Sequence, residues 1–252
     1  MLKKFTVFGL LTMSLVLASV ISACLKTDES TPQALTSTQT TANAAAAQHN
    51  GYLDYICAKI ASGELNKVKS NESILQLKNL TKAYFRTGTN AEMNSFIDQS
   101  FERYFTNYSG VEQITPLFGD PALASSVSAI GILILNYENQ TISEFTASTS
   151  AMLDRATQTQ LSNGFASIVG VAQGSYGYWF SITPASCYYS SLPGVQERAC
   201  GEKCKKLAGL ALADLAGAAD GAAAGTLLGG VGAGPGAVMG GAIYSGLLAL
   251  SW

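Results

Sequence analysis

A four-residue spacing of small residues near the C-terminus limits the fold more than any other feature of this 252-residue chain. Residues 217–241 are mostly glycine and alanine. The four-residue spacing begins before this segment, at Gly209, and continues within it to Gly240. Positions four apart share one face of an α-helix, so the pattern predicts a groove that lets a second helix approach closely. The positions are Gly209, Ala213, Gly217, Gly221, Gly225, Gly229, Gly236 and Gly240.

Glycine within a helix destabilises it by roughly 0.5–1 kcal/mol relative to alanine. A row of glycines therefore indicates that close packing against a neighbour compensates for this loss. The segment 230–235 is rich in glycine and contains Pro235. Proline removes a backbone donor and glycine frees the backbone, so a helix should end there. The sequence therefore predicts two helices, near 205–229 and 236–250, folded into a glycine-zipper hairpin over residues 207–252.

The apolar tail leaves two environments open, a membrane and a protein interior. Residues 221–252 contain no charged side chain, and the first helix is long enough to cross a bilayer. However, Asp214 and Asp220 lie within that helix, and each aspartate at a bilayer centre costs about 2.5–3.5 kcal/mol. The apolar residues are also mostly alanine and glycine, which drive insertion weakly.

The glycine spacing resembles that of two-peptide and related class II bacteriocins, and that of glycine-zipper outer-membrane lipoproteins. The resemblance implies helix association in or at a membrane and, for the bacteriocins, permeabilisation of a competitor. This tail departs from the bacteriocins because it lacks a double-glycine leader and its charges cancel over residues 196–252. Those charges are Arg198, Lys203, Lys205 and Lys206 against Glu197, Glu202, Asp214 and Asp220.

The N-terminus has the layout of a secretory signal peptide over residues 1–23. Lys3 and Lys4 precede an apolar run over residues 5–20, and small residues lead into Cys24. The stretch Val-Ile-Ser-Ala-Cys over residues 20–24 resembles the lipobox of bacterial lipoproteins. That resemblance implies cleavage before Cys24 and acylation of this residue with chains such as palmitate. More than one acyl chain gives stable membrane anchoring.

The residues after Cys24, Leu-Lys-Thr-Asp-Glu over 25–29, resemble the surface-export signal of Bacteroidota lipoproteins. The resemblance implies an outer-membrane lipoprotein, and both the periplasmic and the external face stay open. Residues 24–49 are polar and low in complexity, so we expect a flexible tether there.

Residues 50–183 carry repeated helix signals, including a capping box at Thr141 and Glu144. They predict an all-α bundle of five or six helices that precedes the hairpin. The opening His-Asn-Gly-Tyr-Leu-Asp-Tyr-Ile, residues 49–56, resembles a group of uncharacterised Bacteroidota lipoproteins, which implies an architecture and no activity.

Residues 184–206 form a connector that contains most of the remaining cysteines. An even number of cysteines outside the cytoplasm suggests up to two disulfides, with three connectivities. We favour a bridge from Cys187 to Cys200 or Cys204, and one from Cys57 to the other, because Cys200 and Cys204 lie only one helical turn apart.

Catalysis, metals, cofactors and nucleic acid are not expected. The net charge is −2 and 13% of residues are charged, so the chain lacks a basic surface for nucleic acid. His49 is the single histidine, so a Ser-His-Asp triad would require it, and we expect it to be a surface or capping residue. No nucleophile, phosphate-loop or metal-ligand motif is present.

The sequence therefore predicts a lipid-anchored cell-envelope protein without catalysis. Its expected partners are the membrane, through the acyl chains on Cys24, and other copies of itself, through the tail. In this interpretation the glycine-zipper tail associates with helices or with the membrane. The alternative is a membrane-permeabilising, bacteriocin-like antibacterial toxin.

Overall fold

Apolar residues at helical spacing form helices throughout the described part of the chain. The computed structural model describes residues 37–66, 70–88, 90–107, 121–157, 163–181, 201–227 and 231–250. Within these ranges every regular element is a helix and none is a strand, so the predicted all-α class is confirmed. The helices are α2 (Ser37–Ala61), α3 (Asn71–Tyr84), α4 (Ala91–Asn107), α5 (Pro121–Leu135), the short 3-10 helix η2 (Tyr137–Asn139), α6 (Ile142–Thr157), α7 (Asn163–Phe180), α9 (Glu202–Leu227) and α10 (Ala233–Ala249).

The start of α6 shows how the local sequence sets a helix boundary. The Thr141 hydroxyl oxygen accepts a hydrogen bond from the Glu144 amide at 3.2 Å, and the Glu144 carboxylate accepts one from the Thr141 amide at 2.8 Å. This reciprocal pair is the predicted capping box, and it satisfies two amides that the helix itself leaves without partners. The bonds from Thr141 also lower the pKa of the exposed Glu144 carboxyl.

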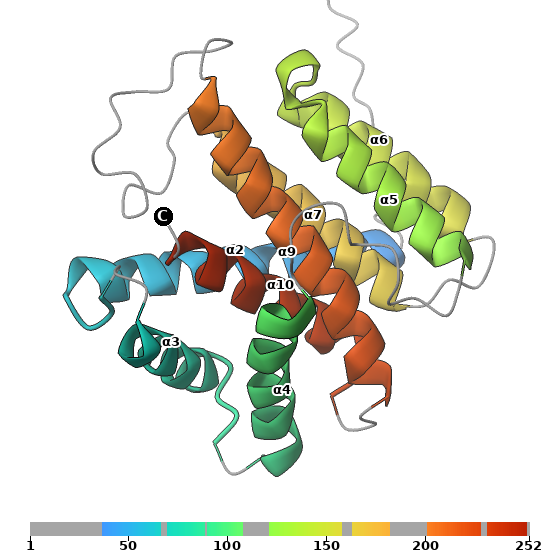
Figure 1. Ribbon diagram of the computed structural model, residues 1–252. Coiled ribbons are helices and arrows are strands. Elements are labelled where there is room, and N and C mark those ends of the chain that lie inside the picture. Colours follow the sequence, from blue (N-terminus) through green and yellow to red (C-terminus); the bar gives the residue numbers. More distant parts are fainter. Residues whose placement is uncertain are drawn as a thin grey trace, which may run out of the picture. The chain divides into compact units, whose positions relative to one another are not determined.

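Four helices, α2, α7, α9 and α10, form the centre of the fold. The most extensive contacts join α9 to α10 and α2 to α7, and α7 also packs against both α9 and α10. In Figure 1, α3 and α4 lie on one side of this centre, while α5 and α6 lie next to each other on another side. The peripheral helices thus flank a core that the C-terminal part of the chain largely fills.

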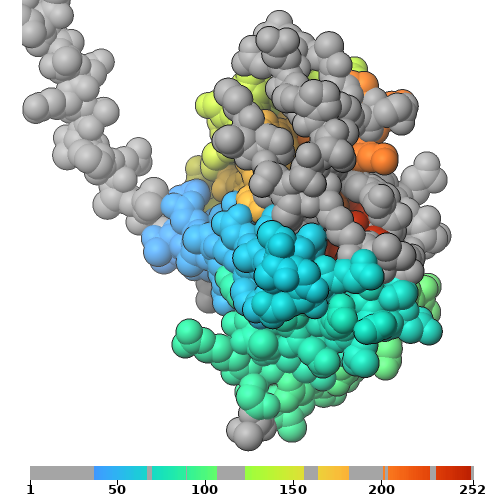
Figure 2. Space-filling view, turned by 90° about the vertical axis from the view of Figure 1, so that its left-hand side faces the viewer, coloured from blue at the N-terminus to red at the C-terminus, as the bar shows by residue number. Residues whose placement is uncertain are grey.

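Helix α10 is enclosed by other helices over most of its length. Its residues Gly236–Leu247 are all buried, and it packs against α9, α7, α2, α4 and α3. A helix that is apolar on every face must be enclosed by protein or by lipid, and here protein encloses it. In Figure 2, α2, α3 and α4 lie on the lower part of the visible face.

Helix α2 corrects the prediction that residues 24–49 form a flexible tether. The helix begins at Ser37, and the part over 37–49 packs on α7, with Ala42 fully buried. A Cβ atom added to Gly170 of α7 would overlap the carbonyl oxygen of Ala42, so the two backbones touch here. Alanine is the strongest helix former, and its small side chain permits this approach. Composition alone predicted a tether because these residues bury little area individually.

The predicted boundary between a helical domain at residues 50–183 and a hairpin at residues 207–252 does not separate two cores. Residues 36–252 form one compact unit in which α9 and α10 pack directly on α2 and α7. Helix α9 also begins at Glu202, so it includes the last residues of the predicted connector at 184–206. The helices before the connector lack a complete core of their own because α10 occupies their centre.

Candidate functional site

A buried group of polar side chains, which we call the Asp214 cluster, lies where α2, α7 and α9 meet. It consists of His49, Ser175, Trp179 and Asp214, and none of them is more than 1% exposed. One carboxylate oxygen of Asp214 lies 3.0 Å from Nε2 of His49. The other oxygen accepts hydrogen bonds from the Ser175 hydroxyl and, at 2.9 Å, from the Trp179 indole N–H. A single carboxylate therefore joins three helices.

The hydrogen bonds of His49 favour a doubly protonated imidazolium ring. Its Nε2 faces the Asp214 carboxylate, and its Nδ1 lies 3.2 Å from the side-chain oxygen of Asn50. The Asn50 amide nitrogen donates to the Gly174 carbonyl at 3.2 Å, and this bond fixes the Asn50 oxygen toward the ring. Both ring nitrogens thus face acceptors and both must donate. Burial opposes the charge, but the Asp214 charge and the hydrogen bonds raise the pKa of His49 overall.

The raised pKa predicts that His49 makes stability depend on pH. A group with a raised pKa in the folded state contributes stability that is complete below its ordinary pKa of 6.5 and is lost as pH rises through the folded value. We therefore expect the urea midpoint of unfolding to fall as pH rises above about 6.5, the ordinary pKa of this side chain. In the His49→Gln variant this fall should be smaller. An equal fall in the variant would show that His49 does not cause it.

The Asp214 cluster contains serine, histidine and aspartate but differs from a catalytic triad. In a triad the serine hydroxyl bonds to the imidazole, which takes its proton. Here Ser175 donates to the Asp214 carboxylate instead, and His49 donates to the other carboxylate oxygen. The prediction that His49 lies at the surface or caps a helix is also wrong, because it lies inside α2 and is 0% exposed.

A second, partly buried ion pair, the Asp220 cluster, lies about two turns further along α9. It consists of Arg103, Asp220 and Tyr244. Nε of Arg103, on α4, lies 2.8 Å from Oδ2 of Asp220, and the Tyr244 hydroxyl of α10 donates to the same oxygen at 3.0 Å. Asp220 is 3% exposed. Burial and the Asp220 charge raise the pKa of the Tyr244 hydroxyl, which therefore keeps its proton and serves as a donor.

The sequence contained only a general signal for these two clusters. Asp214 and Asp220 are the only charged residues after Lys206, and a charge within an apolar helix requires a partner. The identity of the partner was not readable, because His49 lies 165 residues from Asp214 and Arg103 lies 117 residues from Asp220.

The predicted small-residue positions form part of a close contact between α9 and α10, which we call the glycine seam. It consists of Gly217, Gly221 and Gly225 on α9, of Gly236 and Gly240 on α10, and of Gly232, the N-cap residue just before α10. A Cβ atom on any of the three α9 glycines would overlap the carbonyl oxygen of its α10 counterpart. The register runs in opposite directions along the two helices, from 217 with 240 to 225 with 232, so the helices are antiparallel.

Gly232 ends the seam and is its single member that the spacing did not predict. Its φ of 78° lies in the left-handed region, which glycine adopts at little cost. Its amide donates to the Gly225 carbonyl at 3.1 Å, which ties the start of α10 to the end of α9. Pro235 lies in the first turn of α10, where a missing amide is tolerated.

Of the remaining predicted site residues, some belong to the part of the chain that the structure describes and others do not. Ala213 is buried and Gly209 is half-buried on α9, while Cys24, Cys187, Cys200 and Gly229 lie outside the described residues. Cys57 lies on α2 with its sulfur 3.8 Å from the Tyr178 hydroxyl, and Cys204 lies in the first turn of α9. The pairing of the cysteines stays a prediction.

A second small-residue contact, between α2 and α7, was missed by the sequence analysis. Gly170 and Gly174 of α7 face Ala42 and Ala46 of α2, and a Cβ on Gly174 would lie 3.0 Å from the Ala46 Cα. In each helix the two small residues are four positions apart, and this spacing is the sequence pattern that indicates a close helix contact. It was overlooked because residues 42–46 fell inside the predicted tether.

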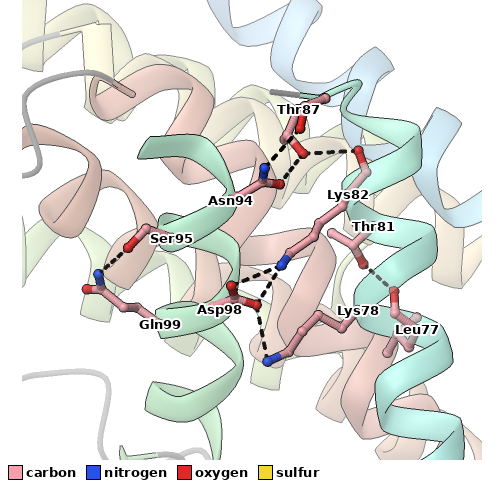
Figure 3. Close-up of polar contacts among 10 residues, drawn as sticks. Leu77, Lys78, Thr81, Lys82, Thr87, Asn94, Ser95, Asp98 and Gln99 are labelled. Atoms are coloured by element: carbon pink, nitrogen blue, oxygen red, sulfur yellow. Dashed lines mark hydrogen bonds and ion pairs between the residues drawn. The ribbon is translucent and has the colours of Figure 1, made fainter. Parts of the chain in front are cut away.

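The surface between α3 and α4 carries a further polar network (Figure 3). The Asp98 carboxylate pairs with Lys78 at 3.3 Å and with Lys82 at 2.8 Å. Partial burial opposes ionisation of Asp98, but the hydrogen bonds from both lysines lower the pKa of its carboxyl. A hollow of about 400 Å³ beside Lys82 and Thr87 is therefore bordered by one cation, Lys82, which is already paired with Asp98.

A larger hollow, of about 650 Å³, lies between α2, the start of α7 and the start of α10. Its walls are mainly small or apolar, as at Ala44, Ala45, Pro235 and Val238. Among the residues that the structure describes, no group of three histidine, cysteine, aspartate or glutamate side chains could hold a metal ion.

Helix α9 alone among the described helices is long and apolar enough to cross a membrane. The qualifying part is Cys204–Leu227, and 78% of its most apolar 18-residue window is buried inside the protein. The core helix of a water-soluble protein has the same properties. Comparisons of the chain with family models, with curated proteins and with solved structures found no match.

Proposed function

We propose that this protein is a lipid-anchored component of the cell envelope that has no catalytic activity. In this proposal the glycine-rich tail serves helix–helix association within the folded chain. The observation that carries the proposal is the glycine seam, because each of its α9 glycines is in backbone contact with α10. A helix pair that places backbone against backbone leaves no room for a substrate between the helices.

The arrangement of the Asp214 cluster supports a structural role. Its carboxylate accepts from Ser175 and Trp179 and pairs with His49, so its hydrogen bonds are used to join helices. The serine hydroxyl is not aligned with a base, and the cluster is closed to solvent. These features favour a fixed core over a reactive centre.

The lipid anchor is tested by replacing Cys24 with serine in the full-length precursor. We expect the wild-type protein to incorporate labelled palmitate and to sediment with outer membranes. The Cys24→Ser variant should lose the label and leave the outer-membrane fraction, because no acyl chain can then form on this residue. A Cys57→Ser variant is the matched control and should keep both properties. Retention of label by Cys24→Ser would contradict the proposal.

We also propose that Cys57, Cys187, Cys200 and Cys204 form two disulfides in the exported protein. Cys57 is partly enclosed between α2 and α7, and a bridge from it would attach the 184–206 connector to the core. Mass analysis of the mature protein after thiol alkylation tests this. We expect no alkylation of these four cysteines without a reductant and complete alkylation after reduction and unfolding.

We propose self-association through the tail only for molecules in which α9 and α10 have separated. The glycines of α9 face those of α10 in the same chain, so a second copy would reach the seam only after the pair opens. We therefore propose that the main partner of the tail is its own chain.

The second candidate function is permeabilisation of membranes. The observation that favours it is the length and apolar character of α9, followed by a tail without charges. Dye release from liposomes by the Cys24→Ser protein tests this function apart from the anchor. Release at nanomolar protein would favour a toxin, while liposomes that stay intact would favour the structural role.

A further inference from the structure

The charged residues of the chain are distributed unevenly along its sequence. Three stretches, residues 30–53, 156–196 and 221–252, contain no aspartate, glutamate, lysine or arginine. By contrast, residues 71–107, which include α3 and α4, contain eight such residues. Soluble domains have about 25% charged residues on average, so uncharged stretches of this length indicate an unusual surface where they meet.

The three uncharged stretches meet around the hollow of about 650 Å³. Its walls come from the first half of α2, the first turns of α7 and the start of α10, and none of the described residues that line it is charged. We call the exposed surface at and next to this hollow the neutral end. It is defined by Thr40 and Ala44 of α2, Leu227 of α9 and Pro235 of α10, all of which are exposed.

Leu227 places a large apolar side chain on this uncharged surface. It is the last residue of α9 and is 86% exposed, more than any other large apolar side chain that the structure describes. Two positions earlier, the Gly225 carbonyl accepts a hydrogen bond from the amide of Gly232, which lines the hollow. Leu227 therefore lies beside the hollow. A single exposed leucine is common on protein surfaces, but this one borders a surface without charges.

The chain leaves the fold toward Cys24 from the same place. Helix α2 begins at Ser37, whose carbonyl accepts a hydrogen bond at 3.0 Å from the hydroxyl of Thr41, a residue that lines the hollow. Only residues 25–36 separate Ser37 from Cys24. Fully extended, this segment spans at most about 45 Å. An acylated Cys24 would therefore keep the neutral end within that distance of the bilayer.

We propose that the neutral end is a membrane-docking surface that rests on the bilayer holding the Cys24 anchor and places Leu227 in the lipid interface. The inference rests on the proposed lipid anchor. Charged side chains would have to lose their hydration on contact with lipid, and the neutral end has none among its described residues. The fold stays intact in the docked state, because Leu227 is already exposed and no helix has to move.

The anchor makes the bilayer the favoured occupant of this surface. A tethered surface meets the membrane at a high effective concentration, so one leucine and a small uncharged surface are sufficient where they would bind weakly alone. A second copy of the chain has no such advantage, because it must arrive by diffusion.

Two other exposed side chains provide comparisons. Leu75 of α3 is 56% exposed, and Leu77 of the same helix packs against Gly246. Gly246 lies near the end of α10, about 21 Å along the helix from Gly232 at its start. Ile132 of α5 is 67% exposed, and α5 contributes none of the described residues that line the hollow. Docking through the neutral end should leave both side chains in water.

The test replaces the natural anchor, so that failure of acylation and failure of docking are distinguishable. The mature chain carries a histidine tag in place of Cys24 and is held on phosphatidylcholine liposomes by a nickel-chelating lipid. The photoreactive amino acid benzoylphenylalanine replaces Leu227, Leu75 or Ile132 in three separate proteins. All three side chains are exposed, so the replacements leave the core intact. Lipid adducts are measured by mass spectrometry after irradiation.

We expect about tenfold more lipid adduct at position 227 than at position 75 or 132, because burial of one leucine in lipid shifts the docking equilibrium by at least this factor. Equal adducts at all three positions would overturn the inference, and so would more adduct at position 132 than at position 227. An adduct between position 227 and a second copy of the chain would also overturn it. None of these outcomes affects the result for palmitate labelling of Cys24.

A second measurement tests whether Leu227 and the hollow act as one surface. The photoreactive amino acid is placed at Ala44, which is exposed and lines the hollow. Leu227→Asp should reduce the lipid adduct at position 44 about tenfold, because a carboxylate replaces the side chain that enters lipid. Leu75→Asp is the matched control and should leave this adduct unchanged. An adduct at position 44 that survives Leu227→Asp would overturn the role of Leu227.

Salt distinguishes an uncharged docking surface from an electrostatic one. Raising the salt concentration from about 0.1 M to about 1 M shortens the screening length from about 10 Å to about 3 Å. Adduct formation at position 227 should not fall over this range, because the described residues of the neutral end carry no charge. Loss of the adduct at high salt would show that charged residues elsewhere hold the fold on the membrane, and it would overturn the inference.

Discussion

Replacement of Gly221 with alanine is expected to destabilise the protein by about 3 kcal/mol or more, although it adds only one methyl group. The added Cβ would overlap the carbonyl oxygen of Gly236 and would lie 3.0 Å from the Cα of Gly240. Both obstacles are backbone atoms, so they cannot be relieved by a side-chain rotation. The two helices must move apart, which opens the whole glycine seam. The change in the free energy of unfolding is measured by urea denaturation.

Gly177 provides the matched control because it is also a glycine within a helix. A Cβ there would meet nothing closer than Cγ2 of Ile142 at 4.0 Å, which is an ordinary contact. Gly177→Ala should therefore stabilise the protein by about 0.4–1 kcal/mol, through lower entropy of the unfolded chain. The two substitutions are chemically identical and are expected to have opposite signs. If Gly221→Ala is neutral, the close contact between α9 and α10 is wrong. Leucine at Gly221 or Gly225 should prevent association of the two helices altogether.

Replacement of Asp214 with alanine should have a comparable effect, a loss of about 3–5 kcal/mol in the free energy of unfolding. The carboxylate pairs with His49 and accepts from Ser175 and Trp179, and all of these groups are buried. Its removal leaves the imidazolium charge facing an apolar gap and takes the acceptor from two donors. Thermal and urea unfolding would measure the loss.

Asp54 is the control for Asp214. It also accepts a hydrogen bond from an α7 side chain, the Tyr178 hydroxyl, at 2.9 Å, but it lies at the surface. Water can replace that bond, so Asp54→Ala should cost less than about 1 kcal/mol. An additional Asp214→Ala, His49→Gln variant tests the cause of the loss. It should recover part of the stability, because the buried charge without a counterion is then gone. No recovery would show that packing, rather than charge, sets the cost.

The prediction of local features succeeded where a short stretch contains the whole signal. The capping box at Thr141 and Glu144 depends on residues three apart, and the structure confirms it. The ends of the C-terminal helices were predicted to within a few residues because Pro235 and the neighbouring glycines act locally. The tether at residues 24–49 was wrong beyond Ser37 because the stability of α2 comes from its contact with α7.

The sequence by itself determined the helical class, the helix boundaries near capping and breaking residues, and the row of glycines that demands a close neighbour. These depend on backbone sterics and on periodicity, which act over a few residues. Only the tertiary structure decided that α10 is enclosed by α2, α4 and α7, and that His49 and Arg103 neutralise Asp214 and Asp220. An apolar glycine-rich helix has the same sequence pattern in lipid as in a protein core. Its environment is decided by the helices that pack around it, through contacts between residues more than a hundred positions apart.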